Sequence, residues 1–131
     1  MVEQSVSLPF RYAVGGAGVF FDELRDHGRL LGSCCGRCRR VACPARAFCV
    51  ACGEATPATV DVGPAGTLLS WTSLASADYG LVALDGADGA LVHRLLGPRD
   101  RWRSGLRVHA QLGAHRVGSI LDIAGFRAEQ P

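Results

Sequence analysis

The sequence predicts a mainly β protein in which an N-terminal helix and a zinc ribbon precede a small five-stranded barrel. Three observations support this prediction: all six cysteines lie within residues 34–53, a helical apolar pattern comes before them, and short β-like runs follow them. The expected divisions are 1–32 for an N-terminal arm and helix, 33–58 for the ribbon and 59–131 for the barrel. A chain of 131 residues suits about one ordinary domain, or two very small ones that share a core.

The composition is that of a folded globular domain, with 48% hydrophobic and 20% charged residues. Arginine supplies every positive side chain, and the formal net charge is +2. Four thiolates on one divalent metal ion would bring this charge close to zero. That balance argues against a mainly electrostatic nucleic-acid binder, whose domain usually carries a clear basic excess.

The N-terminal stretch is a poor signal peptide, because it has an acid at Glu3, no basic n-region and an apolar run broken by glycines. No window approaches the roughly 18 apolar residues of a membrane span. We therefore expect a cytoplasmic protein with no membrane segment. In that compartment clustered cysteines are more often metal ligands than disulfides.

Residues 19–31 have the periodicity of an amphipathic helix, since Phe20, Leu24 and Leu31 recur at helical spacing with charged residues between them. Gly28 offers a stop near the end of this range. Neighbouring residues on a helix are separated by about 100°, so Phe20 and the adjacent Phe21 cannot both face the barrel. One of the two rings is expected to pack on a partner subunit, or under the ribbon or the preceding chain.

From Thr59 onward the pattern changes to short runs typical of strands, namely TVDVGPAGTLLSWTSLA, YGLVALDG, ALVHRLLG, LRVHAQLG and RVGSILDIAGF. GPAG predicts a bulge or sharp bend within the first run, DGADG a hairpin connection and GPRDRWRSG a loop. Five short strands within about seventy residues favour a small closed barrel, and the five-stranded OB-fold is the economical choice.

The strongest signal is the pair of motifs Cys35-Gly-Arg-Cys38 and Cys49-Val-Ala-Cys52, which lie ten residues apart. Two residues between thiolates let a tight turn point both sulfurs at one ion, and two such turns complete the tetrahedron that zinc accepts. We expect Cys35, Cys38, Cys49 and Cys52 to hold one structural Zn²⁺ per chain. A redox role for either motif is the weaker alternative, because a thioredoxin-type site uses one such motif in a βαβ setting.

Two cysteines remain outside this set. Cys34 competes with Cys35, since a spacing of three residues from Cys34 to Cys38 is also possible, but the two-residue gap of Cys35 matches the second motif. Cys43 lies between the two motifs. The favoured interpretation of both Cys34 and Cys43 is a small side chain that is buried or half-buried rather than catalytic.

The order of helix, four-cysteine ribbon and OB-like barrel resembles the acyl-CoA-associated zinc-ribbon and OB-fold family, long catalogued as a domain of unknown function. The resemblance covers nearly the whole chain, and the combination of motifs is more specific than the cysteine spacing alone. The motifs are LPFRYAVG at 8–15, GRLLGSCCGRC at 28–38, CPARAFCVAC at 43–52, PAGTLLSWT at 64–72 and RVGSILDIAGF at 116–126. Two residues depart from the family pattern: Arg39 stands where glycine is frequent, and Ala45 stands in a segment that is usually Pro-Pro-Arg.

This resemblance implies a rubredoxin-like ribbon and a noncatalytic accessory subunit that binds a thiolase-like catalytic subunit, in an α2β2 or larger assembly. The partner would be a thiolase, a retro-aldolase or an acyltransferase acting on acyl thioesters, and would carry the nucleophile or base. The accessory subunit would stabilise the partner and, in some assemblies, help to form the acyl-CoA site.

The residues themselves agree with a noncatalytic chain, because the sequence has no GxSxG elbow, no HExxH and no Walker loop. Its four histidines are scattered along the chain. Among charged groups, a basic run surrounds Trp102 and consists of Arg99, Arg101, Arg103 and Arg107, of which the first three are the candidate contacts. This run could contact the phosphates of coenzyme A or an acidic partner surface, with the indole as an anchor, or it could be a solvated turn.

The alternative function is that of a single-stranded nucleic-acid-binding protein, because ribbons and OB barrels both serve nucleic acids. Arg37, Arg39, Arg40 and Arg46 on the ribbon favour it. Aromatic stacking platforms in a basic groove are the usual requirement, and the barrel segment offers few aromatic residues. They are Trp71, Tyr79, Trp102 and Phe126, of which Phe126 is expected in the core.

Overall fold

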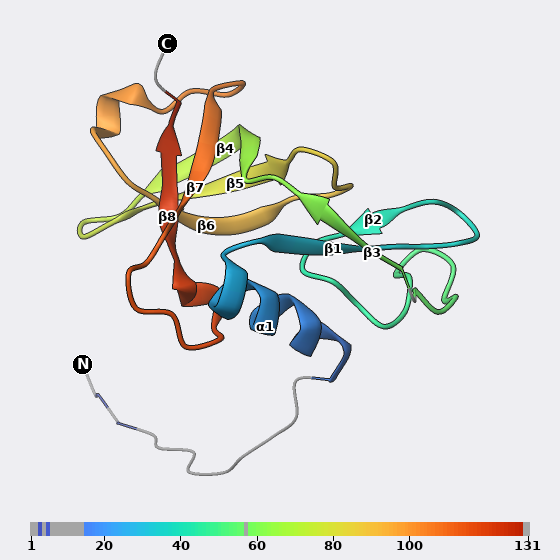
Figure 1. The fold of residues 1–131 in the computed structure, drawn as a ribbon. Coiled ribbons are helices and arrows are strands. Elements are labelled where there is room, and N and C mark those ends of the chain that lie inside the picture. Colours follow the sequence, from blue (N-terminus) through green and yellow to red (C-terminus); the bar gives the residue numbers. More distant parts are fainter. Residues whose placement is uncertain (1–2, 4, 6–14, 57, 130–131) are drawn as a thin grey trace.

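The computed structural model describes residues 3, 5, 15–56 and 58–129 and shows a mainly β chain with one α-helix (Figure 1). The helix α1 (Gly18–His27) is followed by a three-stranded sheet in the order β2-β1-β3 and by a closed barrel in the order β4-β5-β6-β8-β7. The predicted helix, ribbon and five-stranded barrel are therefore confirmed. The strands are β1 (Leu30–Cys34), β2 (Val41–Ala42), β3 (Ala58–Val62), β4 (Ala65–Ser73), β5 (Asp78–Leu84), β6 (Leu91–Leu95), β7 (Arg107–Leu112) and β8 (Ile123–Ala128).

The helix ends four residues earlier than the sequence pattern predicted, at His27 rather than at residue 31. Gly28 adopts a left-handed conformation with φ 67° and donates its N–H to Leu24 O at 3.1 Å, which closes the helix. Leu31 then belongs to β1, where it pairs with Asp61 of β3. Strand pairing thus overrides the helical spacing of this leucine, and the 19–31 prediction was wrong at its C-terminal end.

The first β-like run of the sequence divides into two strands at the bend predicted for GPAG. Before the bend, β3 pairs antiparallel with β1 in the three-stranded sheet. After it, β4 enters the barrel and pairs with β5 and β7. One stretch of chain therefore connects the two sheets, and in Figure 1 the three-stranded sheet projects from one side of the barrel.

The hydrophobic core is continuous from α1 through the three-stranded sheet into the barrel. Phe20 and Leu24 of the helix are fully buried, as is Phe126 of β8, which confirms the expectation that Phe126 is a core residue. The predicted DGADG hairpin joins the antiparallel strands β5 and β6. Among the described residues, no helix combines the length and apolar composition that a bilayer crossing requires.

The segment LPFRYAVG lies outside the described residues except for its last glycine, so the structure adds nothing to that part of the sequence pattern. The three 3₁₀ turns that complete the described chain are η1 (Gly15–Ala17), η2 (Arg99–Arg101) and η3 (Ile120–Asp122).

Candidate metal centre

The two CxxC motifs form turns with the same backbone hydrogen bonds. In the first turn, Cys35 O accepts from Arg39 N at 3.0 Å, and Cys35 N donates to Arg40 O at 2.9 Å. In the second, Cys49 O accepts from Gly53 N at 2.9 Å, and Cys49 N donates to the carbonyl oxygen five residues later at 2.8 Å. Each turn therefore directs two thiols to the same side, as the spacing predicted.

The four sulfur atoms of these turns converge on one point. All of them lie within 4.8 Å of one another, with Sγ separations of 3.4 Å for Cys35 and Cys52 and 3.5 Å for Cys38 and Cys49. A tetrahedral zinc site with Zn–S bonds of about 2.3 Å places its sulfurs roughly 3.8 Å apart, so the observed separations fit such an ion. The four cysteines are thus positioned for metal binding.

Backbone donors favour the thiolate form of the leading cysteine in each turn. The N–H groups of Cys38 and Arg37 lower the pKa of Cys35 to about 6. The N–H groups of Cys52 and Ala51 lower the pKa of Cys49 in the same way. Because zinc binds the thiolate rather than the thiol, this effect favours metal binding at the leading cysteine of each turn.

The other two cysteines lie away from this cluster. Cys34 places its sulfur 3.8 Å from Cys35 O and 3.9 Å from Arg39 O, so it contacts the first turn only through the backbone. Burial raises the pKa of Cys43 to about 12, so this thiol stays protonated in the physiological range. Among the described residues, the four motif cysteines are the one group of His, Cys, Asp or Glu residues that could hold a metal ion.

The ribbon is joined to the barrel by hydrogen bonds as well as by the shared core. Val41 in β2 donates its N–H to Asp88 Oδ2 at 2.9 Å, and Asp88 N donates to Val41 O at 2.8 Å. Asp88 lies in the hairpin between β5 and β6, so this reciprocal pair fixes the cysteine-bearing sheet against the barrel. Local sequence patterns do not predict this contact, because the two residues are 47 positions apart.

The structure places Phe20 and Phe21 in different surroundings. Phe20 is fully buried, whereas Phe21 is partly exposed and packs edge-on against Phe20 with ring centroids 5.3 Å apart. Phe21 also lines a shallow hollow beside the ribbon residues Pro44–Ala47. The ribbon therefore lies beside Phe21 and leaves its ring partly exposed, while packing of this ring on a partner subunit stays a prediction.

The structure corrects one expectation about the basic run, namely the role of Trp102. Trp102 is buried, with 5% of its surface exposed, and its Nε1–H donates to Asp78 Oδ2 at 2.9 Å. The indole therefore anchors the loop to the barrel and is not available to a partner, which corrects the expectation. Arg99 lies 2.9 Å from Asp78 Oδ1 and donates to Leu74 O at 2.8 Å, whereas Arg101 and Arg103 have no recorded ion pair with described residues.

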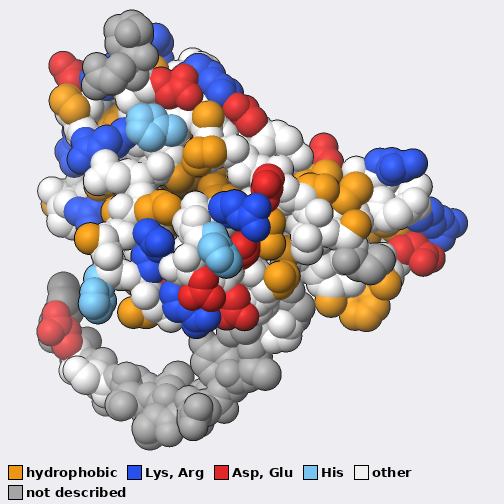
Figure 2. Space-filling model, viewed as in Figure 1, with side chains coloured by type: hydrophobic (Ala, Val, Ile, Leu, Met, Phe, Trp, Pro, Cys, Tyr) orange, Lys and Arg blue, Asp and Glu red, His pale blue; other side chains and the backbone are white. Residues whose placement is uncertain are grey.

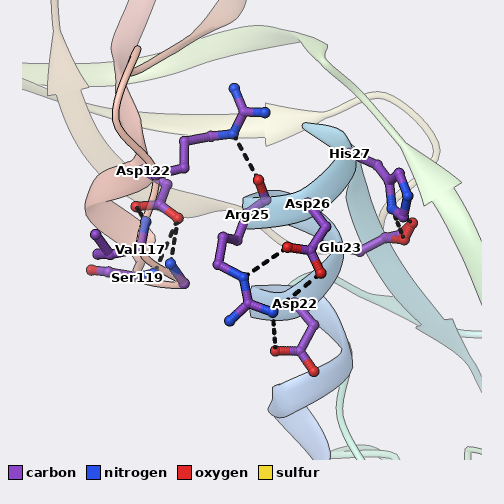
Figure 3. Close-up of polar contacts among 10 residues, drawn as sticks. Asp22, Glu23, Arg25, Asp26, His27, Val117, Ser119 and Asp122 are labelled. Atoms are coloured by element: carbon purple, nitrogen blue, oxygen red, sulfur yellow. Dashed lines mark hydrogen bonds and ion pairs between the residues drawn. The ribbon is translucent and has the colours of Figure 1, made fainter.

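Sequence reasoning missed a buried carboxylate in the loop before β8. Asp122 is 2% exposed and accepts the backbone N–H groups of Val117, Gly118 and Ser119 at 2.9, 2.7 and 3.3 Å (Figure 3). Ser119 in turn accepts from Leu121 N, which completes a capping box. The signal was present in the sequence, because Ser-x-x-Asp is the spacing of that motif.

Comparison with known proteins gives one family-model match, which covers the ribbon. Residues 22–58 match the family model described as ChsH2, rubredoxin-like zinc ribbon domain. No curated protein matches the chain.

Two solved structures share the fold at 21% sequence identity. One is titled "Ltp2-ChsH2(DUF35) aldolase", with a TM-score of 0.63 over 90% of this chain and 98% of that chain. The other is a protein of unknown function from the DUF35 family of Sulfolobus solfataricus, with a TM-score of 0.66 over 88% of this chain and 87% of that chain. The family match covers the ribbon, and at this identity the two likenesses show a shared fold; both agree with the resemblance found in the sequence.

Proposed function

We propose that this chain, whose residues 22–58 match the ChsH2 rubredoxin-like zinc ribbon model, is a noncatalytic accessory subunit of a thiolase-superfamily complex. The partner is a thiolase, a retro-aldolase or an acyltransferase that acts on acyl thioesters, in an α2β2 or larger assembly. Support comes from the similar structure described as an "Ltp2-ChsH2(DUF35) aldolase".

The convergence of four thiols on one point is the observation that carries this proposal. Four cysteine sulfurs fill the coordination sphere of a zinc ion, so the metal has no open position for water or substrate. A closed site of this kind stabilises a small lobe that buries too little surface to fold alone. The zinc held by Cys35, Cys38, Cys49 and Cys52 therefore shapes a binding surface, and the bond chemistry belongs to the partner.

The exposed part of the basic run is proposed to contact the phosphates of coenzyme A or the partner near a shared acyl-CoA site. Arg101 and Arg103 are the residues for this role, because their guanidinium groups are exposed and have no recorded partner among the described residues. Arg99 contributes less, since it already binds Asp78 and Leu74 O. Replacing both Arg101 and Arg103 by Gln should weaken binding of the acyl-CoA to the complex while the isolated chain stays folded.

Single-stranded nucleic acid is a weaker ligand for this surface. Two of the four barrel aromatics, Trp102 and Phe126, are buried and cannot stack on bases. On the face shown in Figure 2, blue basic side chains are scattered among red acidic ones rather than gathered in one groove.

The test of this function is isolation of the tagged chain from its native cell, followed by mass spectrometry of the proteins that come with it. A thiolase-like polypeptide in near-stoichiometric amount is the expected result. Purification of the chain without such a polypeptide, together with salt-sensitive retention of single-stranded DNA or RNA, would contradict it and favour the nucleic-acid alternative.

A further inference from the structure

A surface groove lies between strand β6 and the turn η3, on the outer side of the barrel. It has a volume of about 490 Å³ and is lined by Tyr79, Val92, His93, Arg94, Ile120, Leu121, Ile123 and Ala124. We call it the β6–η3 groove. Its apolar lining is exposed: Val92 is 68% and Leu121 77% accessible to solvent. Large apolar side chains gathered on one surface are typical of a binding site.

The groove exists because the barrel is only loosely closed at this seam. Between β6 and β8 the structure records a single ladder pair, Leu95 with Phe126, and one further bond from Leu96 N to Phe126 O at 2.8 Å. On the other edge of β6, by contrast, β5 pairs along five residues. The first part of β6 is therefore a strand edge that faces the groove.

The backbone of Val92 is available along this edge. Peptide groups of alternate residues point to the same side of a strand, so those of Val92 and Arg94 point the same way as Leu96 N, toward β8. Arg94 N is already taken, because it donates to His93 Nδ1 at 2.8 Å. The one ladder pair between β6 and β8 lies at Leu95, so Val92 N has no ladder partner in β8, and an added extended segment can bond there.

The charges around the groove have one sign. Arg94 is exposed, has no recorded ion pair among the described residues, and no carboxylate lines the groove. His93 is not a free donor, because its Nε2 lies 3.2 Å from Ile120 O and its Nδ1 accepts from Arg94 N, so both ring nitrogens already have a partner. The groove thus combines an apolar surface with one uncompensated cation.

The wall formed by η3 is held in place before any ligand binds. Asp122 accepts three backbone N–H groups of its own loop, and Arg116 Nε donates to Arg25 O at 3.1 Å, which fastens the loop to the end of α1 (Figure 3). Leu121 therefore projects from a fixed turn. A preformed surface lowers the entropy lost on binding.

We propose that the β6–η3 groove binds an extended segment of the partner protein, with apolar side chains and one carboxylate that pairs with Arg94. The identity of that partner rests on the proposed function, whereas the chemistry of the segment rests on the groove itself. An extended segment suits the open edge at Val92, and a carboxylate supplies the charge that Arg94 lacks. Nucleic acid suits the groove poorly, because Tyr79 is its sole exposed aromatic side chain.

Photo-crosslinking tests this inference in the full chain in its native cell. The variant Leu121→p-benzoylphenylalanine reports the groove, and Leu74→p-benzoylphenylalanine, 53% exposed in the turn between β4 and β5, is the matched control. We expect the first variant to crosslink to an apolar segment that contains Asp or Glu, and the control to give at least about fivefold less of that product. No crosslink at Leu121, or a crosslink to RNA or to a second copy of this chain, overturns the proposal.

Charge reversal supplies the second measurement. Arg94→Glu in the tagged chain should reduce about tenfold the amount of the crosslinked protein that co-purifies with it. Arg127→Glu, on the neighbouring strand and outside the groove, should leave this amount unchanged. Changing the carboxylate of the identified segment to Arg should restore binding to Arg94→Glu. Equal retention by both arginine variants, with unchanged circular dichroism, contradicts the proposal.

The two proposals fail in different ways. If a thiolase-like polypeptide co-purifies but Leu121 gives no crosslink to it, the accessory function stands and the groove assignment falls. If Leu121 crosslinks an acidic, apolar segment of another kind of protein and Arg94→Glu abolishes this product, the groove assignment stands and the thiolase partner is wrong.

Discussion

Arg39 and Gly53 occupy the same position in the two cysteine turns, and both adopt a positive φ, 65° for Arg39 and 78° for Gly53. Each donates its N–H to the leading cysteine four residues before it. A left-handed conformation costs an L-residue with a side chain about 1–2 kcal/mol, whereas glycine adopts it freely. The first turn therefore carries backbone strain that the second does not.

This relationship predicts that Arg39→Gly stabilises the protein. Relief of the strain outweighs the added chain entropy of glycine in the unfolded state, so we expect a net gain of about 0.5–1 kcal/mol in the free energy of unfolding. Gly53→Ala is the converse variant and should lose a similar net amount, about 0.5–1 kcal/mol, since the same entropy difference offsets part of the strain. Denaturant unfolding of the zinc-loaded proteins measures both. A loss of stability in Arg39→Gly would contradict the equivalence of the two turns.

Gly53→Ala tests the backbone conformation alone, because the space around Gly53 is open. A Cβ added at this position meets no atom within 4 Å, so the loss in Gly53→Ala comes from the backbone conformation and not from a clash. Unchanged stability in this variant would show that the positive φ is not needed to form the turn.

Metal analysis tests the choice among the six cysteines. Elemental analysis should find about one zinc per chain, and Cys49→Ser should lose both the metal and the cooperative unfolding of the ribbon. Cys34→Ser and Cys43→Ser serve as matched controls and should keep the zinc, because neither sulfur belongs to the convergent set. Loss of zinc in Cys34→Ser with retention in Cys35→Ser would move the ligand to the other cysteine.

The carboxylate of Asp122 predicts a pH dependence of stability. Burial alone would raise its pKa, but the backbone N–H groups of Val117, Gly118 and Ser119 outweigh this effect and lower the pKa. A carboxyl group with a lowered folded-state pKa contributes stability above its unfolded pKa of about 3.9, and this contribution is lost as the pH falls through the folded value.

Asp122→Asn should accordingly destabilise the protein by about 1–3 kcal/mol at pH 7, because an amide cannot accept all three bonds. The difference from the wild type should shrink below about pH 4. Denaturant unfolding between pH 3 and pH 7 measures it, with Asp100→Asn, an exposed residue of η2, as control. A constant difference across this range argues against an ionised Asp122.

The bond between Trp102 and Asp78 predicts a spectroscopic change. Asp78→Ala leaves the buried indole N–H without its acceptor, which should cost about 1–3 kcal/mol. In a Trp71→Phe background, where Trp102 is the single tryptophan, the emission should move to longer wavelength as water enters. Unchanged emission and stability would show that the hydrophobic contacts of Trp102 alone hold the loop.

Much of this fold follows from local sequence signals. The spacing of the cysteines gives the ribbon, and the turn residues between β-like runs give the five strands of the barrel. The end of the helix was mispredicted because Leu31 fits the helical period and the strand equally well. Only its pairing with Asp61, 30 positions later, decides between them.

The candidate sites likewise include features that the local sequence predicts and features that it does not. The matching gaps within the two motifs favour Cys35 over Cys34 from the sequence alone, and in the structure both turns repeat one hydrogen-bond pattern. The burial of Trp102 and the β6–η3 groove depend on contacts between distant segments. Neither the acceptor at Asp78 nor the weak pairing of β6 with β8 leaves a pattern in the local sequence.

The most direct test of the central claim compares acyl-thioester turnover by the isolated chain, by the co-purified partner and by the reconstituted complex. We expect no turnover by the zinc-loaded chain alone, and turnover by the complex that is lost when the partner's nucleophile is replaced. Turnover of an acyl thioester by this chain, purified free of any other protein, would contradict the account.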